Sequence, residues 1–110
     1  MNTKIEYLYR DASNYKVWNE CVIRGEISEE QIETIISCLN CGEYFIPEQV
    51  GLPANRFDTV TEDDHCWMEL DADSFSSTDE NPTVDLDVAQ LVQRFQDIDG
   101  CWKDIAYAIY

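Results

Sequence analysis

Two segments of this 110-residue chain begin with a motif that fixes the start of a helix. In each, a capping residue stands three positions before a glutamine: Ser28 before Gln31, and Asp87 before Gln90. This capping-box spacing lets both side chains satisfy free backbone N–H groups at the helix start. Apolar residues follow at helical spacing, namely Ile32, Ile35, Ile36 and Leu39 in the first segment and Val88, Leu91, Val92, Phe95 and Ile98 in the second. We therefore expect two amphipathic helices, the first ending at position 40 or 41 and the second at position 99 or 100.

Residues 4–10 and 15–23 alternate between apolar and polar side chains, which is the two-residue period of a β-strand. The turn-forming cluster at residues 11–14 between them predicts an antiparallel hairpin. Residues 65–70 alternate again and predict a third strand. The polar, serine-rich stretch at residues 71–85 predicts a long mobile loop.

A short helical turn is expected from Pro47 to Gly51. The end of the chain, residues 102–109, predicts a last short helix, with a strand at residues 105–110 as the alternative. Together these patterns predict one α+β domain over residues 1–110. Its small antiparallel sheet of about three strands would pack against two or three helices, in the order β-β-α-β-α(-α).

The chain has a formal net charge of −16, and no lysine or arginine occurs between Arg56 and Arg94. Such a chain is repelled by nucleic acid and by anionic lipid, and is attracted to strongly basic protein surfaces. The alternative is that the acidic residues only keep one face solvated. If the acidic half binds a partner, we expect the contacts to come from acids in predicted turns and loops: Glu62, Asp63, Asp64, Asp71, Asp73, Asp79 and Glu80.

No apolar run approaches the roughly 20 residues that a membrane-spanning helix needs, and the first residues contain no apolar signal region. We therefore expect neither membrane insertion nor export, and we expect the protein to act as a monomer in the cytoplasm. Five cysteines in such a compartment are typical of reduced thiols or metal ligands rather than disulfides.

The strongest chemical motif is Cys38-Leu-Asn-Cys41, followed downstream by His65-Cys66. A Cys-x-x-Cys pair that meets a Cys or His across a loop is typical of a structural zinc site, so we predict Zn²⁺ bound by Cys38, Cys41, His65 and Cys66, with Cys21 and Cys101 in reserve. A redox role is disfavoured, because the pair lies at a predicted helix C-terminus, where the helix dipole opposes the thiolate. The alternative is that both cysteines are small apolar residues at a helix end, as we expect Cys21 to be within its strand.

Catalytic motifs are missing from the sequence. It contains no glycine-rich phosphate loop and no Gly-x-Ser-x-Gly elbow, and its single histidine limits nucleophilic schemes to pairs built on His65. We therefore expect a protein that is not an enzyme.

In its small size, strong acidity, α+β plan and lack of catalytic motifs, the chain resembles the anti-CRISPR proteins of phages and mobile elements, specifically the Cas9 inhibitors of type II-A systems. The residues that carry the resemblance are Cys38-Leu-Asn-Cys41 and His65-Cys66, which look like the zinc clamp of a metal-binding member. The resemblance implies a protein of the bacterial host cytoplasm that blocks a Cas9-type nuclease, or another basic nucleic-acid-binding protein, without chemistry. Nucleases of this type have positively charged channels for guide and target.

Two other classes of function remain open at this stage. One is an acidic antirestriction protein that mimics DNA. The other is a small zinc-dependent enzyme or metal-sensing module built on the cysteine cluster. A zinc ion with four protein ligands favours a structural role, whereas an open coordination position favours catalysis.

Overall fold

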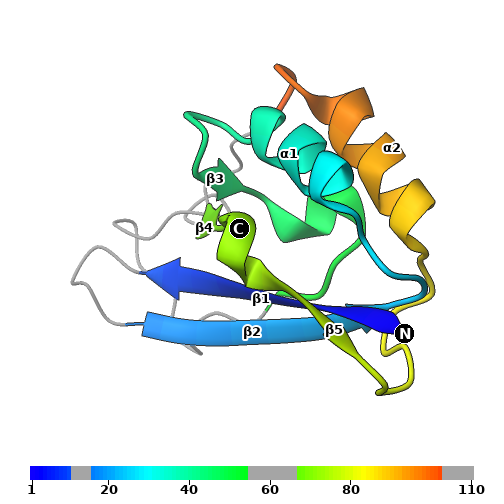
Figure 1. Ribbon diagram of the computed structural model, residues 1–110. Helices are drawn as coiled ribbons and strands as arrows, with labels where there is room; N and C mark the ends of the chain where they lie inside the picture. The colour runs from blue at the N-terminus through cyan, green and yellow to red at the C-terminus, as the bar shows by residue number, and fades with distance from the viewer. Residues whose placement is uncertain (11–15, 55–66, 103–110) are drawn as a thin grey trace.

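The structure, a computed structural model, describes residues 1–10, 16–54 and 67–102. It is an α+β fold in which a five-stranded antiparallel sheet packs against two helices, which confirms the predicted fold class. The strand order is β2-β1-β4-β3, and β5 also pairs with β1. The strands are β1 (Asn2–Arg10), β2 (Lys16–Ile23), β3 (Tyr44–Phe45), β4 (Met68–Glu69) and β5 (Phe75–Thr78). The helices α1 (Glu29–Ser37) and α2 (Val88–Ile98) lie side by side over one face of the sheet (Figure 1).

The predicted hairpin is confirmed as the pair β1 and β2, which run antiparallel with Thr3 opposite Ile23 and Arg10 opposite Lys16. The odd-numbered residues of both strands are buried, apart from the half-buried Val17, and the apolar ones, including Ile5 and Tyr7, form one core cluster with the helices. The even-numbered residues lie on the opposite face of the sheet, because side chains of a strand alternate between faces. The turn predicted at residues 11–14 lies outside the described residues.

Both predicted helix starts are confirmed. Ser28 accepts a hydrogen bond from the N–H of Gln31 at 3.2 Å, and Asp87 accepts one from the N–H of Gln90 at 2.8 Å. Each glutamine side chain in turn accepts from the backbone N–H of its cap, which completes the capping box.

Replacing Asp87 with alanine is expected to lower the free energy of unfolding by about 1 kcal/mol, because the backbone N–H of Gln90 at the start of α2 loses its acceptor. Urea unfolding followed by circular dichroism measures this. Asp79→Ala removes the same charge from an exposed position without a capping role and is the matched control. Equal losses for the two variants would mean that the cap contributes nothing beyond its charge.

Helix α1 ends earlier than predicted, at Ser37 with Cys38 as its C-cap. The N–H groups of Cys38 and Leu39 turn back to carbonyls three residues away, which tightens the last turn. The carbonyl of Cys38 accepts a hydrogen bond from the indole N–H of Trp102 at 2.9 Å. A contact between residues this far apart in the chain is invisible to helical periodicity, which explains the error.

The prediction of a loop over residues 71–85 is wrong in its first half. This segment contains a short 3-10 helix, η2 (Ala72–Ser74), and strand β5, whose residues pair with Asn2 to Ile5 of β1. A serine-rich edge strand with Phe75 as its single large apolar residue gives little alternation to detect. Strand β3 lies between α1 and the turn at Pro47, where the sequence predicts no strand.

The helical turn expected from Pro47 to Gly51 is confirmed as η1 (Pro47–Val50), which ends at Gly51 with a positive φ of 84°. The third predicted strand, at residues 65–70, is observed as β4 with Met68 and Leu70 buried. Its first two residues and the predicted elements beyond residue 102 lie outside the described part of the chain. Within the described ranges, no helix is long and apolar enough to cross a bilayer.

Candidate functional site

The segment after α1 places the two cysteines of the Cys-x-x-Cys motif in different settings. Cys38 is buried at 4% exposure, whereas Cys41 is exposed and has a positive φ of 55°. A left-handed conformation in a residue other than glycine costs on the order of 1–3 kcal/mol and is concentrated at functional sites. The turn is held by hydrogen bonds between Asn40 and Tyr44, at 2.8 and 3.0 Å. The fold therefore maintains a strained backbone at Cys41.

A pocket of about 220 Å³ opens at this turn. Both cysteines line it, together with Trp67 and, from the end of α2 and the residues after it, Gly100 and Trp102. In the sequence, Trp67 directly follows His65-Cys66, and Gly100 and Trp102 flank Cys101. Described residues next in sequence to the other predicted ligands therefore line the same pocket as Cys38 and Cys41. We call this region the cysteine corner.

Four aromatic rings in contact lead from the cysteine corner into the core. Trp102 lies edge-on to Trp67, with ring centroids 6.1 Å apart, and edge-on to Phe95 at 5.9 Å. Phe95 in turn stacks on Phe45 at 5.9 Å. These contacts join the cysteine corner to the main hydrophobic core.

The electrostatics of Cys38 oppose a reactive thiolate. Burial raises its pKa, and the charge of Asp99 raises it further, although a hydrogen bond with Ser37 lowers it. At neutral pH the thiol is therefore protonated unless a cation lies beside it. A bound metal ion would supply that charge and ionise the thiol.

The remaining predicted ligands have different outcomes. His65 and Cys66 lie outside the described residues. Cys21 is buried in the core opposite Ile5, where burial raises the pKa of its thiol to about 11, so the prediction of a core residue is confirmed. Cys101 is an exposed free thiol. Among the described residues, no three His, Cys, Asp or Glu side chains are arranged to hold one metal ion.

The acids predicted to contact a partner differ in their structural settings. Glu62, Asp63 and Asp64 lie outside the described residues. Asp71, Asp73 and Asp79 are exposed, as predicted, although the carboxylate of Asp71 caps η2 by accepting from the N–H of Asp73 at 2.8 Å. Glu80 is held in an ion pair with Lys4 at 2.6 Å, and this hydrogen bond lowers the pKa of its carboxyl.

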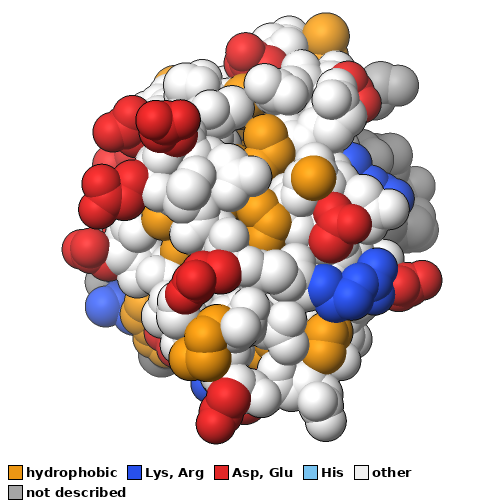
Figure 2. Space-filling model, turned by 45° about the vertical axis from the view of Figure 1, so that its right-hand side comes forward, with side chains coloured by type: hydrophobic (Ala, Val, Ile, Leu, Met, Phe, Trp, Pro, Cys, Tyr) orange, Lys and Arg blue, Asp and Glu red, His pale blue; other side chains and the backbone are white. Residues whose placement is uncertain are grey.

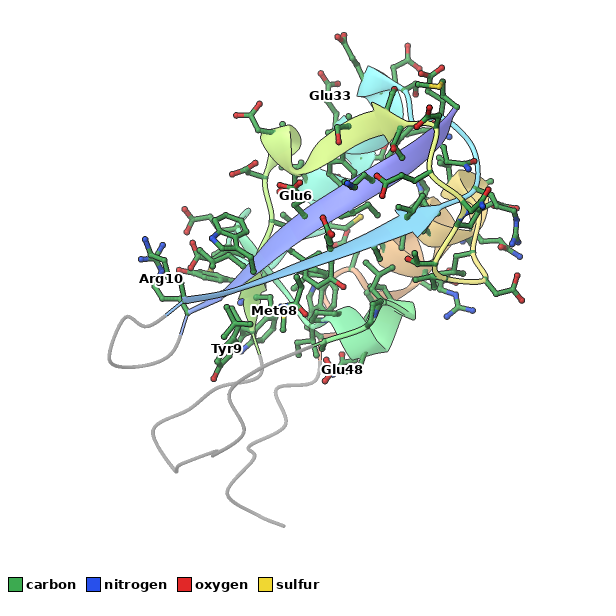
Figure 3. All side chains as sticks on the ribbon, turned by 90° about the horizontal axis from the view of Figure 1, so that it is seen from below. Glu6, Tyr9, Arg10, Glu33, Glu48 and Met68 are labelled. Carbon is green, nitrogen blue, oxygen red and sulfur yellow. The ribbon has the colours of Figure 1, made fainter. Side chains whose placement is uncertain are left out.

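Two of these acids border a hollow on the face of the sheet opposite the helices. Its volume is about 250 Å³, and we call it the acidic groove. Its carboxylates are those of Glu6, Glu43, Glu69, Asp71 and Asp73. Its apolar lining comes from Leu8, Trp18 and Leu70. Figure 3, which shows the sheet in front of the helices, places Glu6 on β1 between the two ends of that strand.

Ion pairs neutralise only part of this surface. Arg10 pairs with Glu69 at 2.9 Å, and within the described ranges no lysine or arginine lies within ion-pair distance of the other four groove carboxylates. Acidic side chains also gather at one edge of the face in Figure 2, where few lysines or arginines are visible. The described surface therefore presents unneutralised negative charge.

Sequence reasoning missed Trp18, Glu6 and Glu43 as candidate contact residues. The signal for Trp18 was present in the sequence. It shares its parity in the strand with Lys16 and Glu20, so it lies on the polar face of the hairpin. Its side chain is 67% exposed. For Glu43, no local pattern could have indicated a groove built from β1, β2 and η2.

Comparison with known protein families, with curated proteins and with solved structures found no match for this chain. The resemblance to anti-CRISPR proteins therefore stays a hypothesis, and a function for this chain has to be argued from the residues described above.

Proposed function

We propose that this protein is a non-catalytic binding protein that inhibits a nucleic-acid-handling enzyme by docking an acidic surface on the enzyme's basic one. The candidate partner is a Cas9-type nuclease. The observation that supports the proposal best is the set of groove carboxylates without an ion-pair partner among the described residues. These charges remain free to attract a basic surface.

Charge of this sign favours one class of partner. Carboxylates repel the phosphates of nucleic acid, and they attract the basic channels in which enzymes hold nucleic acid. A protein docked in such a channel excludes the nucleic acid by occupying its place. The chain's net charge of −16 adds long-range attraction to this contact.

The absence of catalysis is part of the proposal and rests on the lack of catalytic motifs in the sequence. The two buried thiols are also poor nucleophiles. The pKa values of Cys21 and Cys38 are both raised by burial, and nucleophilic cysteines need a lowered pKa.

We propose further that a structural zinc ion holds the cysteine corner together. Cys38 and Cys41 would supply two thiolates, and His65 and Cys66, or Cys101, would complete the ligand set. The convergence of Trp67, Gly100 and Trp102 on the same pocket supports this ligand set. Such an ion would link the end of α1 to the chain around β4 and contribute directly to the folding free energy.

The test is an inhibition assay with a purified type II-A Cas9 and its guide RNA. A small molar excess of the protein is expected to stop cleavage of target DNA. Inhibition should weaken as ionic strength rises, because the Debye length falls from about 10 Å at 0.1 M to about 3 Å at 1 M. Surface plasmon resonance should show the loss mainly in the association rate.

Charge-reversal variants provide the control. Asp73→Lys with Asp79→Lys is expected to slow association about tenfold, whereas Glu29→Lys with Glu33→Lys on α1 should leave it within about twofold. If the helix pair abolishes inhibition and the loop pair does not, the docking surface lies on the helix side. If cleavage proceeds unchanged with several type II-A nucleases while a restriction enzyme is inhibited, the antirestriction alternative replaces this proposal.

A further inference from the structure

The open face of the sheet has an exposed aromatic ring among its carboxylates. Trp18 on β2 lies directly opposite Leu8 on β1, and Leu8 lies opposite Glu69 on β4. The Trp18 side chain is 67% exposed, although an indole ring of this size gains much free energy from burial. Tryptophan is enriched at protein interfaces, because its indole combines a large apolar ring with a polar N–H group.

The row next to Trp18 contains an unfavourable pair. Glu6 on β1 and Glu20 on β2 lie directly opposite each other, and like charges in this position destabilise a sheet. Lys4 lies 3.7 Å from Glu20 but forms its shorter ion pair with Glu80. A cation placed between Trp18 and Glu6 would therefore relieve a repulsion that the described residues leave only partly compensated.

Trp18 and Glu6 also connect two hollows. Both residues line the acidic groove, and both line a second hollow of about 360 Å³ that extends over Asn19 and Glu20. The Trp18 ring and the Glu6 carboxylate are thus common to two open depressions along β1 and β2. This arrangement suits an extended cationic segment better than one compact ligand.

Other occupants fit less well. The acidic groove, at about 250 Å³, is below the usual range of roughly 300–1,000 Å³ for small-molecule pockets, and the second hollow, at about 360 Å³, is at its lower end. Its carboxylates, all within the described residues, do not converge on one point as metal ligands do. Phosphate-bearing ligands, whether nucleic acid or lipid, are repelled.

We propose that the open sheet face binds an arginine-rich segment of a protein partner, with one guanidinium stacked on the Trp18 ring and bound to the Glu6 carboxylate. This inference rests on the proposed function and assigns its docking surface. Arginine suits the site better than lysine, because its planar guanidinium stacks on aromatic rings and binds carboxylates through two parallel hydrogen bonds. Residues Glu43 and Asp73 at the other end of the acidic groove would bind further basic side chains of the same segment.

The experiment titrates the full chain with an arginine-rich peptide and with a lysine-rich peptide of equal length, by isothermal titration calorimetry. The arginine peptide is expected to bind more tightly. Trp18→Ala should weaken it about tenfold, which corresponds to about 1.4 kcal/mol and lies within the range for a partly desolvated cation–π contact. Trp18→Ala should reduce the affinity for the lysine peptide less than the affinity for the arginine peptide. Trp18→Phe should bind the arginine peptide more tightly than Trp18→Ala does, because it keeps an aromatic ring. Circular dichroism checks that each variant is folded.

Matched charge variants separate the groove from the general charge. The affinity for the arginine peptide is expected to fall severalfold in the double variant Glu6→Gln with Asp73→Asn. It should change less than twofold in the control variant Glu29→Gln with Glu33→Gln on α1. If Trp18→Ala binds as the wild type does, or both charge pairs weaken binding equally, the groove assignment is overturned while the proposed function stands. If the wild-type protein binds neither peptide at low salt, the proposed function fails as well.

Discussion

Replacing Phe95 with alanine is expected to lower the free energy of unfolding by about 3–5 kcal/mol. The side chain is completely buried on α2, between the stacked ring of Phe45 and the edge-on ring of Trp102. Its removal leaves a cavity and also breaks two aromatic contacts. Since small domains have a total stability of about 5–15 kcal/mol, the variant loses a large fraction of it. Urea unfolding measures the loss as a lower midpoint at an unchanged slope.

The neighbouring residue provides the control. Gln96→Ala lies one position along the same helix on its exposed side and should change stability by less than about 0.5 kcal/mol. Because Trp102 joins Phe95 to the carbonyl of Cys38, Phe95→Ala should also loosen the cysteine corner, seen as faster alkylation of the Cys38 thiol. A loss below about 1 kcal/mol would mean that α2 does not pack on the sheet in the way described.

Purified protein is expected to contain about one zinc ion per chain, and a strong chelator should lower its unfolding free energy by several kcal/mol. The reason is that a structural ion binds the folded chain and not the unfolded one, so its binding free energy adds to the stability. Elemental analysis measures the metal. The exposed thiol of Cys41 should react slowly with a thiol reagent while the ion is bound and quickly after chelation.

Two buried cysteines distinguish a ligand from a core residue. Cys38→Ser should destabilise the protein and also abolish the effect of the chelator. Cys21→Ser places the same hydroxyl in the core, at a position 2% exposed, and should destabilise the protein while leaving the chelator effect intact. Metal-free protein whose Cys41 reacts quickly and whose stability ignores the chelator would overturn the zinc proposal, and Cys38 would then be a core residue at a helix end.

The elements with strong local signals were predictable. Both capping boxes lie where the sequence placed them, because a cap and its glutamine interact within a single turn. The hairpin was also predictable, since alternation over eight or nine residues assigns each side chain to one face. Strands β3 and β5 were not recognised. One has two residues, and the other has serine or threonine at three of its four positions, so their pairing with β4 and β1 depends on the neighbouring strand rather than on their own pattern.

The sequence by itself determined the two helix starts, the faces of β1 and β2, and the large negative charge, because each depends on neighbouring residues or on composition alone. It also pointed to Cys38 and Cys41 as a pair. Only the tertiary structure decided where the charge gathers. The acidic groove joins Glu6, Glu43 and Asp73 from three separate segments, and β1 brings them together by pairing with β2 on one side and with β4 and β5 on the other. Pairing between distant strands is a long-range property that no local window contains, and it is what surrounds the exposed ring of Trp18 with carboxylates.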